Sequence, residues 1–159
     1  MTTPYTRSGT LRGLVLATAL TGTLLLLADF AGAIWSGGSP LAMLTGIASG
    51  VIGDAAWRGP VTGPLLGLLV HFIVIGVLVD LYIVASIRMV ALNHHWRISG
   101  VVFGVFAWIV RSTLAAPRDW PPVFLTLTPR ETVVQILLHV ALLGLPVALL
   151  VRWAARWKA

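Results

Sequence analysis

The stretch GLLVHFIVIGVLVDLY, residues 67–82, places one histidine and one aspartate, His71 and Asp80, among almost exclusively apolar residues. An ionised side chain in hydrocarbon costs about 3 kcal/mol or more, so such residues pair with other polar groups or line ion and substrate pathways. His71 and Asp80 are nine residues apart and therefore point to opposite faces of a helix. They need separate explanations.

His71 belongs with three other ionisable residues, Asp29, Arg111 and His139, each of which interrupts a different apolar stretch. At a rise of about 1.5 Å per residue, all four lie roughly 7–12 Å below the same end of their stretches. Asp29 and Arg111 have opposite charges and can reduce each other's desolvation cost by pairing. The two histidines would bond to this pair, to each other or to water. The sequence thus predicts a buried polar layer.

The same residues leave functional alternatives open. His71 and His139 could serve as the two axial ligands of a b-type haem, with Arg111 beside a propionate, as in an electron-transfer subunit. Zinc is disfavoured, because Asp29 is the one further protein ligand in the layer, so no metal is expected. A small proton-coupled transporter or channel subunit is the second alternative, since intramembrane Asp, His and Arg often line polar pathways.

The composition indicates a membrane-integral chain. Of 159 residues, 58% are hydrophobic and 10% are charged, whereas soluble domains carry about 25% charged residues. The mean hydropathy is +0.95. The net charge of +6 comes from basic residues set singly at the ends of apolar runs, so no basic face is available for nucleic acid. The absence of cysteine excludes disulfides and thiolate chemistry.

Four apolar stretches are long enough to cross a bilayer, at about 14–34, 64–87, 98–115 and 132–154. Backbone polar groups cannot stay unpaired in lipid, so each stretch must be a helix. We therefore expect an all-α fold, an integral membrane four-helix bundle that forms a single domain over 1–159.

Two segments allow a second interpretation. Arg7, Arg12, the leucine-rich run and AGA at 31–33 also resemble a secretory signal with a cleavage site, although the length of the run and Asp29 favour a retained helix. Residues 37–62 are apolar, glycine-rich and too short to span. They predict a short interfacial or re-entrant helix between the first two spans, with a glycine-rich loop as the alternative.

The distribution of basic residues predicts the orientation. Seven flank the spans on one side and three on the other, which places both termini in the cytoplasm. The seven are Arg7, Arg12, Arg88, Arg97, Arg152, Arg156 and Lys158, and the three are Arg58, Arg118 and Arg130.

Local signals refine the helices. TPRE at 128–131 predicts a capping box that starts the last helix, and SP at 39–40 predicts the start of a short helix. Residues 116–122, APRDWPP, predict a loop. Gly100 and Gly104 form a G-x-x-x-G pair for close helix contact, and Pro146 should bend its helix.

Three stretches resemble a family of small, uncharacterised bacterial inner-membrane proteins with four helices. They are IASGVIGDAAWRGPVTGPLLGLLVHFIV (47–74), GVVFGVFAWIV (100–110) and LLHVALLGLPVALLVR (137–152), about two thirds of the chain. The resemblance implies a fold and a location, the bacterial inner membrane, and no reaction. Arg111 departs from the family's uncharged third-helix ending, so the resemblance does not imply the Asp29–Arg111 pair.

These observations predict a non-enzymatic structural or accessory bundle in the lipid bilayer, acting as a homo-oligomer or within a larger membrane complex. Motifs such as G-x-S-x-G, H-E-x-x-H or a phosphate-binding glycine loop are absent from the sequence. Asp80 is expected to pair with Arg97 or Arg152 near the cytoplasmic end. His94 and His95 are expected to be solvated residues of a short turn.

Overall fold

The structure, a computed structural model, describes residues 7–114 and 128–156. Within these ranges the chain is helical and contains no strand, in agreement with the all-α prediction. The elements are α1 (Arg7–Trp35), α2 (Pro40–Ile52), the 3-10 helix η1 (Gly53–Arg58), α3 (Thr62–Arg88), α4 (Val90–His94), α5 (Trp96–Leu114), α7 (Pro129–His139), the π-helical turn η2 (Val140–Gly144) and α8 (Leu145–Arg156). The predicted loop at 116–122 lies outside the described residues.

Three helical stretches are long and apolar enough to cross a membrane, and they match three of the predicted spans to within a few residues. They are Gly13–Trp35, Thr62–Arg88 and Pro129–Ala154. α5, of 19 residues, covers 98–114 of the predicted third span but is not one of these three, so its passage through a membrane stays a prediction. Large apolar side chains such as Leu69, Ile73 and Val77 are exposed along α3, as expected of a surface that faces lipid.

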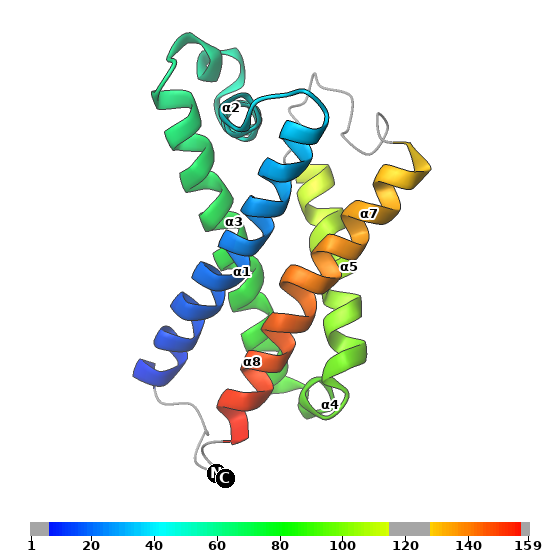
Figure 1. Ribbon diagram of the computed structural model, residues 1–159. Helices are drawn as coiled ribbons and strands as arrows, with labels where there is room; N and C mark the ends of the chain where they lie inside the picture. The colour runs from blue at the N-terminus through cyan, green and yellow to red at the C-terminus, as the bar shows by residue number, and fades with distance from the viewer. Residues whose placement is uncertain (1–6, 115–127, 157–159) are drawn as a thin grey trace.

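The long helices run alongside one another, with α2 across one end and α4 at the other (Figure 1). α1 packs against α3 and α8, while α5 packs against α7, η2 and α8. Leu25, Val79, Leu143 and Val147 are fully buried where these helices meet. Lipid is as apolar as this core, so in a membrane the helices are held by close packing and polar contacts.

Glycines allow a close contact between α5 and η2. A Cβ at Gly104 would lie 2.5 Å from the Val140 Cα, and one at Gly144 would contact the Gly100 carbonyl. The predicted close approach at the Gly100–Gly104 pair is therefore confirmed. A π turn lies just before Pro146, and in it the Leu145 N–H donates to the Val140 carbonyl. The bend predicted at Pro146 stays a prediction.

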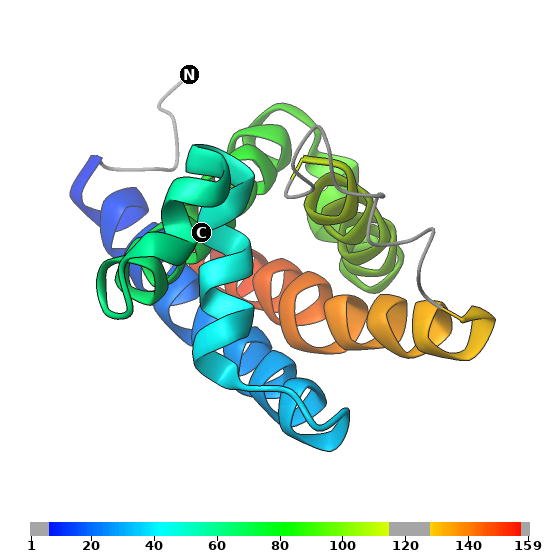
Figure 2. The same ribbon diagram turned by 90° about the horizontal axis from the view of Figure 1, so that it is seen from above.

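α2 lies across the ends of the long helices (Figure 2) and packs closely on α3. It begins as predicted, with Ser39 as the N-cap residue and Pro40 in the first turn. Side chains at Gly63 and Gly67 would collide with the backbone of Ala56 and Leu44, so both positions require glycine. The loop alternative is thus wrong for Pro40–Ile52, while the depth of α2 in a membrane stays a prediction.

The predicted capping box at the start of α7 is confirmed. Thr128 Oγ1 accepts a hydrogen bond from the Glu131 N–H at 3.3 Å, and the Thr128 N–H donates to Glu131 Oε2 at 2.7 Å. Two of the unpaired amides at this helix start are thereby satisfied. At the other end of the molecule, His94 and His95 are exposed as expected, although the predicted turn includes the five-residue helix α4.

Candidate functional site

An ion pair between α5 and α1 forms the centre of the site. Arg111 donates from Nη2 to Asp29 Oδ2 at 2.6 Å and from Nη1 to Asp29 Oδ1 at 3.2 Å. The Asp29 side chain is 3% exposed and that of Arg111 is 24% exposed. A bidentate fork of this kind fixes both the distance and the relative orientation of the two helices. The predicted Asp29–Arg111 pair is therefore present.

His139, the last residue of α7, extends the ion pair to a third helix. Its Nδ1 lies 2.8 Å from the Gln135 carbonyl oxygen, which can only accept, so Nδ1 carries the proton. Nε2 of the neutral ring then accepts from Arg111 Nη1 at 3.3 Å. The buried imidazole thus contributes a hydrogen bond and adds no second positive charge beside Arg111.

His71 does not join this network. Its Nε2 donates instead to the Gly22 carbonyl of α1 at 3.0 Å. The missing side chain of Gly22 makes room for the Phe72 ring, which α3 presses against α1 at this point. The structure therefore brings Asp29, Arg111 and His139 into direct contact, whereas His71 joins α3 to α1 by a separate bond.

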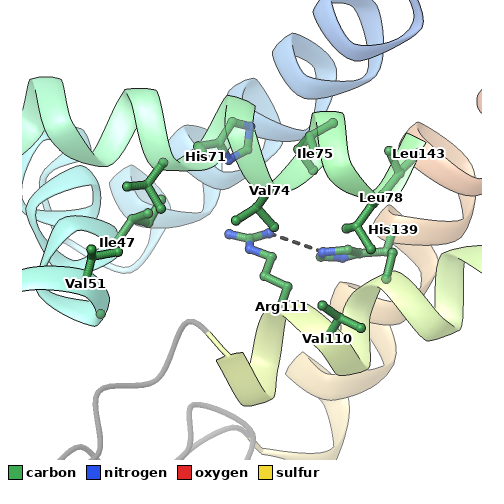
Figure 3. Close-up of a pocket in the computed structure, with 13 residues that line it drawn as sticks. Ile47, Val51, His71, Val74, Ile75, Leu78, Val110, Arg111, His139 and Leu143 are labelled. Carbon is green, nitrogen blue, oxygen red and sulfur yellow. Dashed lines mark hydrogen bonds between the residues drawn. The ribbon is translucent and has the colours of Figure 1, made fainter. Parts of the chain in front are cut away.

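His71, Arg111 and His139 nevertheless line one cavity of about 130 Å³ (Figure 3). In Figure 3 the Arg111 guanidinium lies between the two imidazoles. The remaining walls are apolar and come from α2, α3, α5 and η2. Small-molecule sites usually measure about 300–1,000 Å³, so this cavity is below their range and has room for a few waters.

The geometry gives the haem alternative no support. Axial ligation needs a free nitrogen on each histidine that faces one iron. His139 has no free nitrogen, because its two ring nitrogens are bonded to Gln135 and Arg111. At His71, Nε2 is bonded to the Gly22 carbonyl, which leaves Nδ1. Within 7–114 and 128–156, no three His, Asp or Glu side chains gather in a way that could hold a metal ion.

Asp80 lies outside the site and is exposed on α3. The pairing predicted for it is wrong, because in the described part of the chain no ion pair reaches its carboxylate. Both candidate partners contact the Trp96 ring instead, with the Arg97 Cζ 5.4 Å and the Arg152 Cζ 5.6 Å from its centroid. At about eight residues from the end of α3, Asp80 lies about 12 Å from that end.

Sequence reasoning missed a second polar bridge, between α3 and α5. The Tyr82 hydroxyl lies 2.9 Å from Ser99 Oγ, and the Tyr82 ring packs on Phe103. The sequence places Tyr82 on the same helical face as His71, and this is the signal that it faces the interior. Its partner could not be identified in this way, because a serine in an apolar helix usually bonds to its own backbone.

Comparison of this chain with known protein families, curated proteins and solved structures finds no match. Its site has to be interpreted from its own residues.

Proposed function

We propose that this chain is a non-enzymatic accessory subunit of a larger membrane complex. In this proposal it is a four-helix bundle in the bacterial inner membrane, with α5 as the fourth span. The Asp29–Arg111–His139 network fixes the helices relative to one another, and the exposed face of α3 binds the partner.

The network supports a structural role because the polar side-chain atoms of Asp29 and His139 are used within the chain. Both Asp29 oxygens accept from Arg111, and both His139 nitrogens are bonded. A catalytic or ligand-binding group needs an atom that faces the reactant. An aspartate and a histidine bonded in this way are expected of residues that determine packing.

The observation that carries the accessory role is the exposure of Asp80. Its carboxylate stands among Val77, Leu81 and Val84, which are 64%, 49% and 43% exposed. Charged residues inside spanning helices almost always pair or face water. A carboxylate on an apolar outer face therefore favours a partner helix that supplies the missing positive group.

The partner is expected to be a different chain with a lysine or arginine at the depth of Asp80. A second copy of this chain, related by a two-fold axis through the same face, would place two Asp80 carboxylates together. Repulsion between like charges in lipid disfavours that dimer. A positive group on a partner helix would offset part of the desolvation cost of both groups.

The orientation follows from the basic residues. The start of α1 and the end of α8 lie at the same end of the molecule as α4 (Figure 1). Arg88, Arg97 and Arg152 lie on that side, so it is the side expected to face the cytoplasm.

Cross-linking from α3 tests the proposal. Because the sequence contains no cysteine, an introduced cysteine is the one thiol in this chain that the reagent can label. Val77→Cys carries a thiol-reactive photo-cross-linker in native membranes, and Leu16→Cys, on the exposed face of α1, is the matched control. We expect a heavier adduct from Val77→Cys alone, which Asp80→Asn abolishes and Asp80→Glu retains. An uncross-linked monomer, an adduct of two copies, or one insensitive to Asp80→Asn contradicts the proposal.

The haem and transport alternatives have less support. Transport requires a polar path from Asp80 to the outer layer, yet Asp80 is exposed whereas His71 is buried in the interior. A reduced-minus-oxidised visible spectrum of protein from haem-replete cells tests the haem alternative. A band that disappears in both His71→Ala and His139→Ala would replace our proposal with an electron-transfer role.

A further inference from the structure

Two adjoining hollows lie at the α4 end of the molecule. One is an apolar groove of about 490 Å³ between α3 and α5, whose walls include Leu81, Val102 and Phe106. The other, of about 410 Å³, is lined by His94, His95, Trp96, Arg97, Ile98 and Arg152. The two share His95 and Ile98, so a basic hollow opens directly beside an apolar one.

The basic hollow holds two arginines without a carboxylate. Arg97 and Arg152, from α5 and α8, both contact the ring of Trp96. Among the residues that the structure describes, no acidic side chain forms an ion pair with either guanidinium. Two like charges on one indole ring repel each other, so an anion between them would stabilise the arrangement.

The groove is open toward the side of the bundle. Ile98, Val102 and Phe106 are 67%, 63% and 42% exposed along α5, and Leu81 is 49% exposed on α3. At the inner wall of the groove, the hydroxyl groups of Tyr82 and Ser99 are hydrogen-bonded to each other. The volume of the groove falls within the range of about 300–1,000 Å³ that is usual for small-molecule sites.

We propose that these two hollows together bind one anionic phospholipid. Its phosphate lies between Arg97 and Arg152, and an acyl chain occupies the groove between α3 and α5. Basic pockets beside spanning helices on the cytoplasmic side are suited to acidic headgroups. The apolar groove favours a lipid over a soluble phosphate, which would use the arginines alone. The inference rests on the proposed function for α5 as a membrane span and for the orientation, and it does not depend on Asp80.

Native mass spectrometry of the full chain in mild detergent tests the site. Phosphatidylglycerol and phosphatidylcholine with identical acyl chains are added at equal concentration. We expect at least about tenfold greater retention of phosphatidylglycerol, falling to about twofold or less in the double variant Arg97→Gln/Arg152→Gln. Arg88→Gln, at the same end of α3 but outside the hollow, is the matched control and retains the preference. Arg97→Lys/Arg152→Lys keeps the charge and should retain most of the preference for phosphatidylglycerol.

A second arm tests the groove. Ala85 is half-buried and lines it, so Ala85→Phe fills the space and should lower retention of phosphatidylglycerol. Ala31→Phe, on the exposed face of α1, should not. The proposal is overturned if the two lipids are retained equally, or if Arg88→Gln lowers the preference as much as the double variant does. It is also overturned if glycerol phosphate, at the concentration of the lipid, displaces phosphatidylglycerol. None of these outcomes affects the Val77→Cys adduct, so the two proposals fail separately.

Discussion

Asp29 and Asp80 are both carboxylates within long apolar helices, but they differ in burial and in pairing. Asp29 is buried and held by both arms of the Arg111 guanidinium. Asp80 is exposed and forms no ion pair with the described residues. The first has its partner within the chain, and the second, in our proposal, receives one from another chain. The comparison separates charges that determine the internal packing from charges that are available for assembly.

The two carboxylates should therefore differ in what their removal does. A buried charge that loses its partner is strongly destabilising, whereas an exposed group contributes little to the fold. Each of the following substitutions tests one part of this difference.

Arg111→Leu should have the largest effect, because it leaves the Asp29 carboxylate buried and unpaired. We expect the free energy of unfolding to fall by about 3–5 kcal/mol, measured by circular dichroism during SDS titration in mixed micelles. The double variant Asp29→Leu/Arg111→Leu removes both charges and should recover most of the loss. Equal losses in the single and double variants would show that the pair is not the source of the effect.

Gly104→Val tests whether close packing of α5 supports the buried pair. The new Cβ would lie 2.5 Å from the Val140 Cα, so α5 has to move away from the π turn. Overpacking of this kind costs about 1–3 kcal/mol in the same unfolding assay. At Gly32 a Cβ meets nothing within 4 Å, and Gly32→Ala is the control, expected to leave stability unchanged or raise it slightly.

His71→Phe keeps an aromatic ring but removes the donor to the Gly22 carbonyl. One hydrogen bond is worth about 0.5–1.5 kcal/mol, so the free energy of unfolding should fall by that amount. His94→Phe, on an exposed histidine, is the control and should change it little. A loss as large as that of Arg111→Leu would place His71 within the ion-pair network.

Asp80→Asn should have the smallest effect on the isolated protein, within about 0.5 kcal/mol. The same variant should abolish the heavier adduct from Val77→Cys in native membranes. Stability and assembly are thus measured on one substitution. A large loss of stability in detergent would mean that Asp80 supports the fold of the chain itself, and the comparison with Asp29 would fail.

Much of the helical framework could be predicted from the sequence. Long apolar runs in a chain with few charges give the positions of α1, α3 and the stretch from α7 to α8. The Thr128 capping box and the start of α2 at Pro40 are local signals, so they hold without knowledge of the tertiary structure. The Asp29–Arg111 pair followed from opposite charges at one depth.

The remainder depends on contacts that the sequence does not encode locally. The partner of His71 is a backbone carbonyl, and any residue type supplies one. The π turn arises where Gly144 meets α5, just before Pro146, and neither residue alone specifies it. Opposite charge alone predicts the wrong partners for Asp80, because Arg97 and Arg152 both contact the Trp96 ring.

The separation of 82 residues between Asp29 and Arg111 has a consequence for biosynthesis. Ribosomes add about 5–20 residues per second, so Asp29 is made roughly 4–16 s before its partner. During that interval the first span has to be held by the insertion machinery, remain at the bilayer surface or carry a protonated carboxyl group. Synthesis of Arg111 therefore marks the earliest moment at which α1 can settle in its final position.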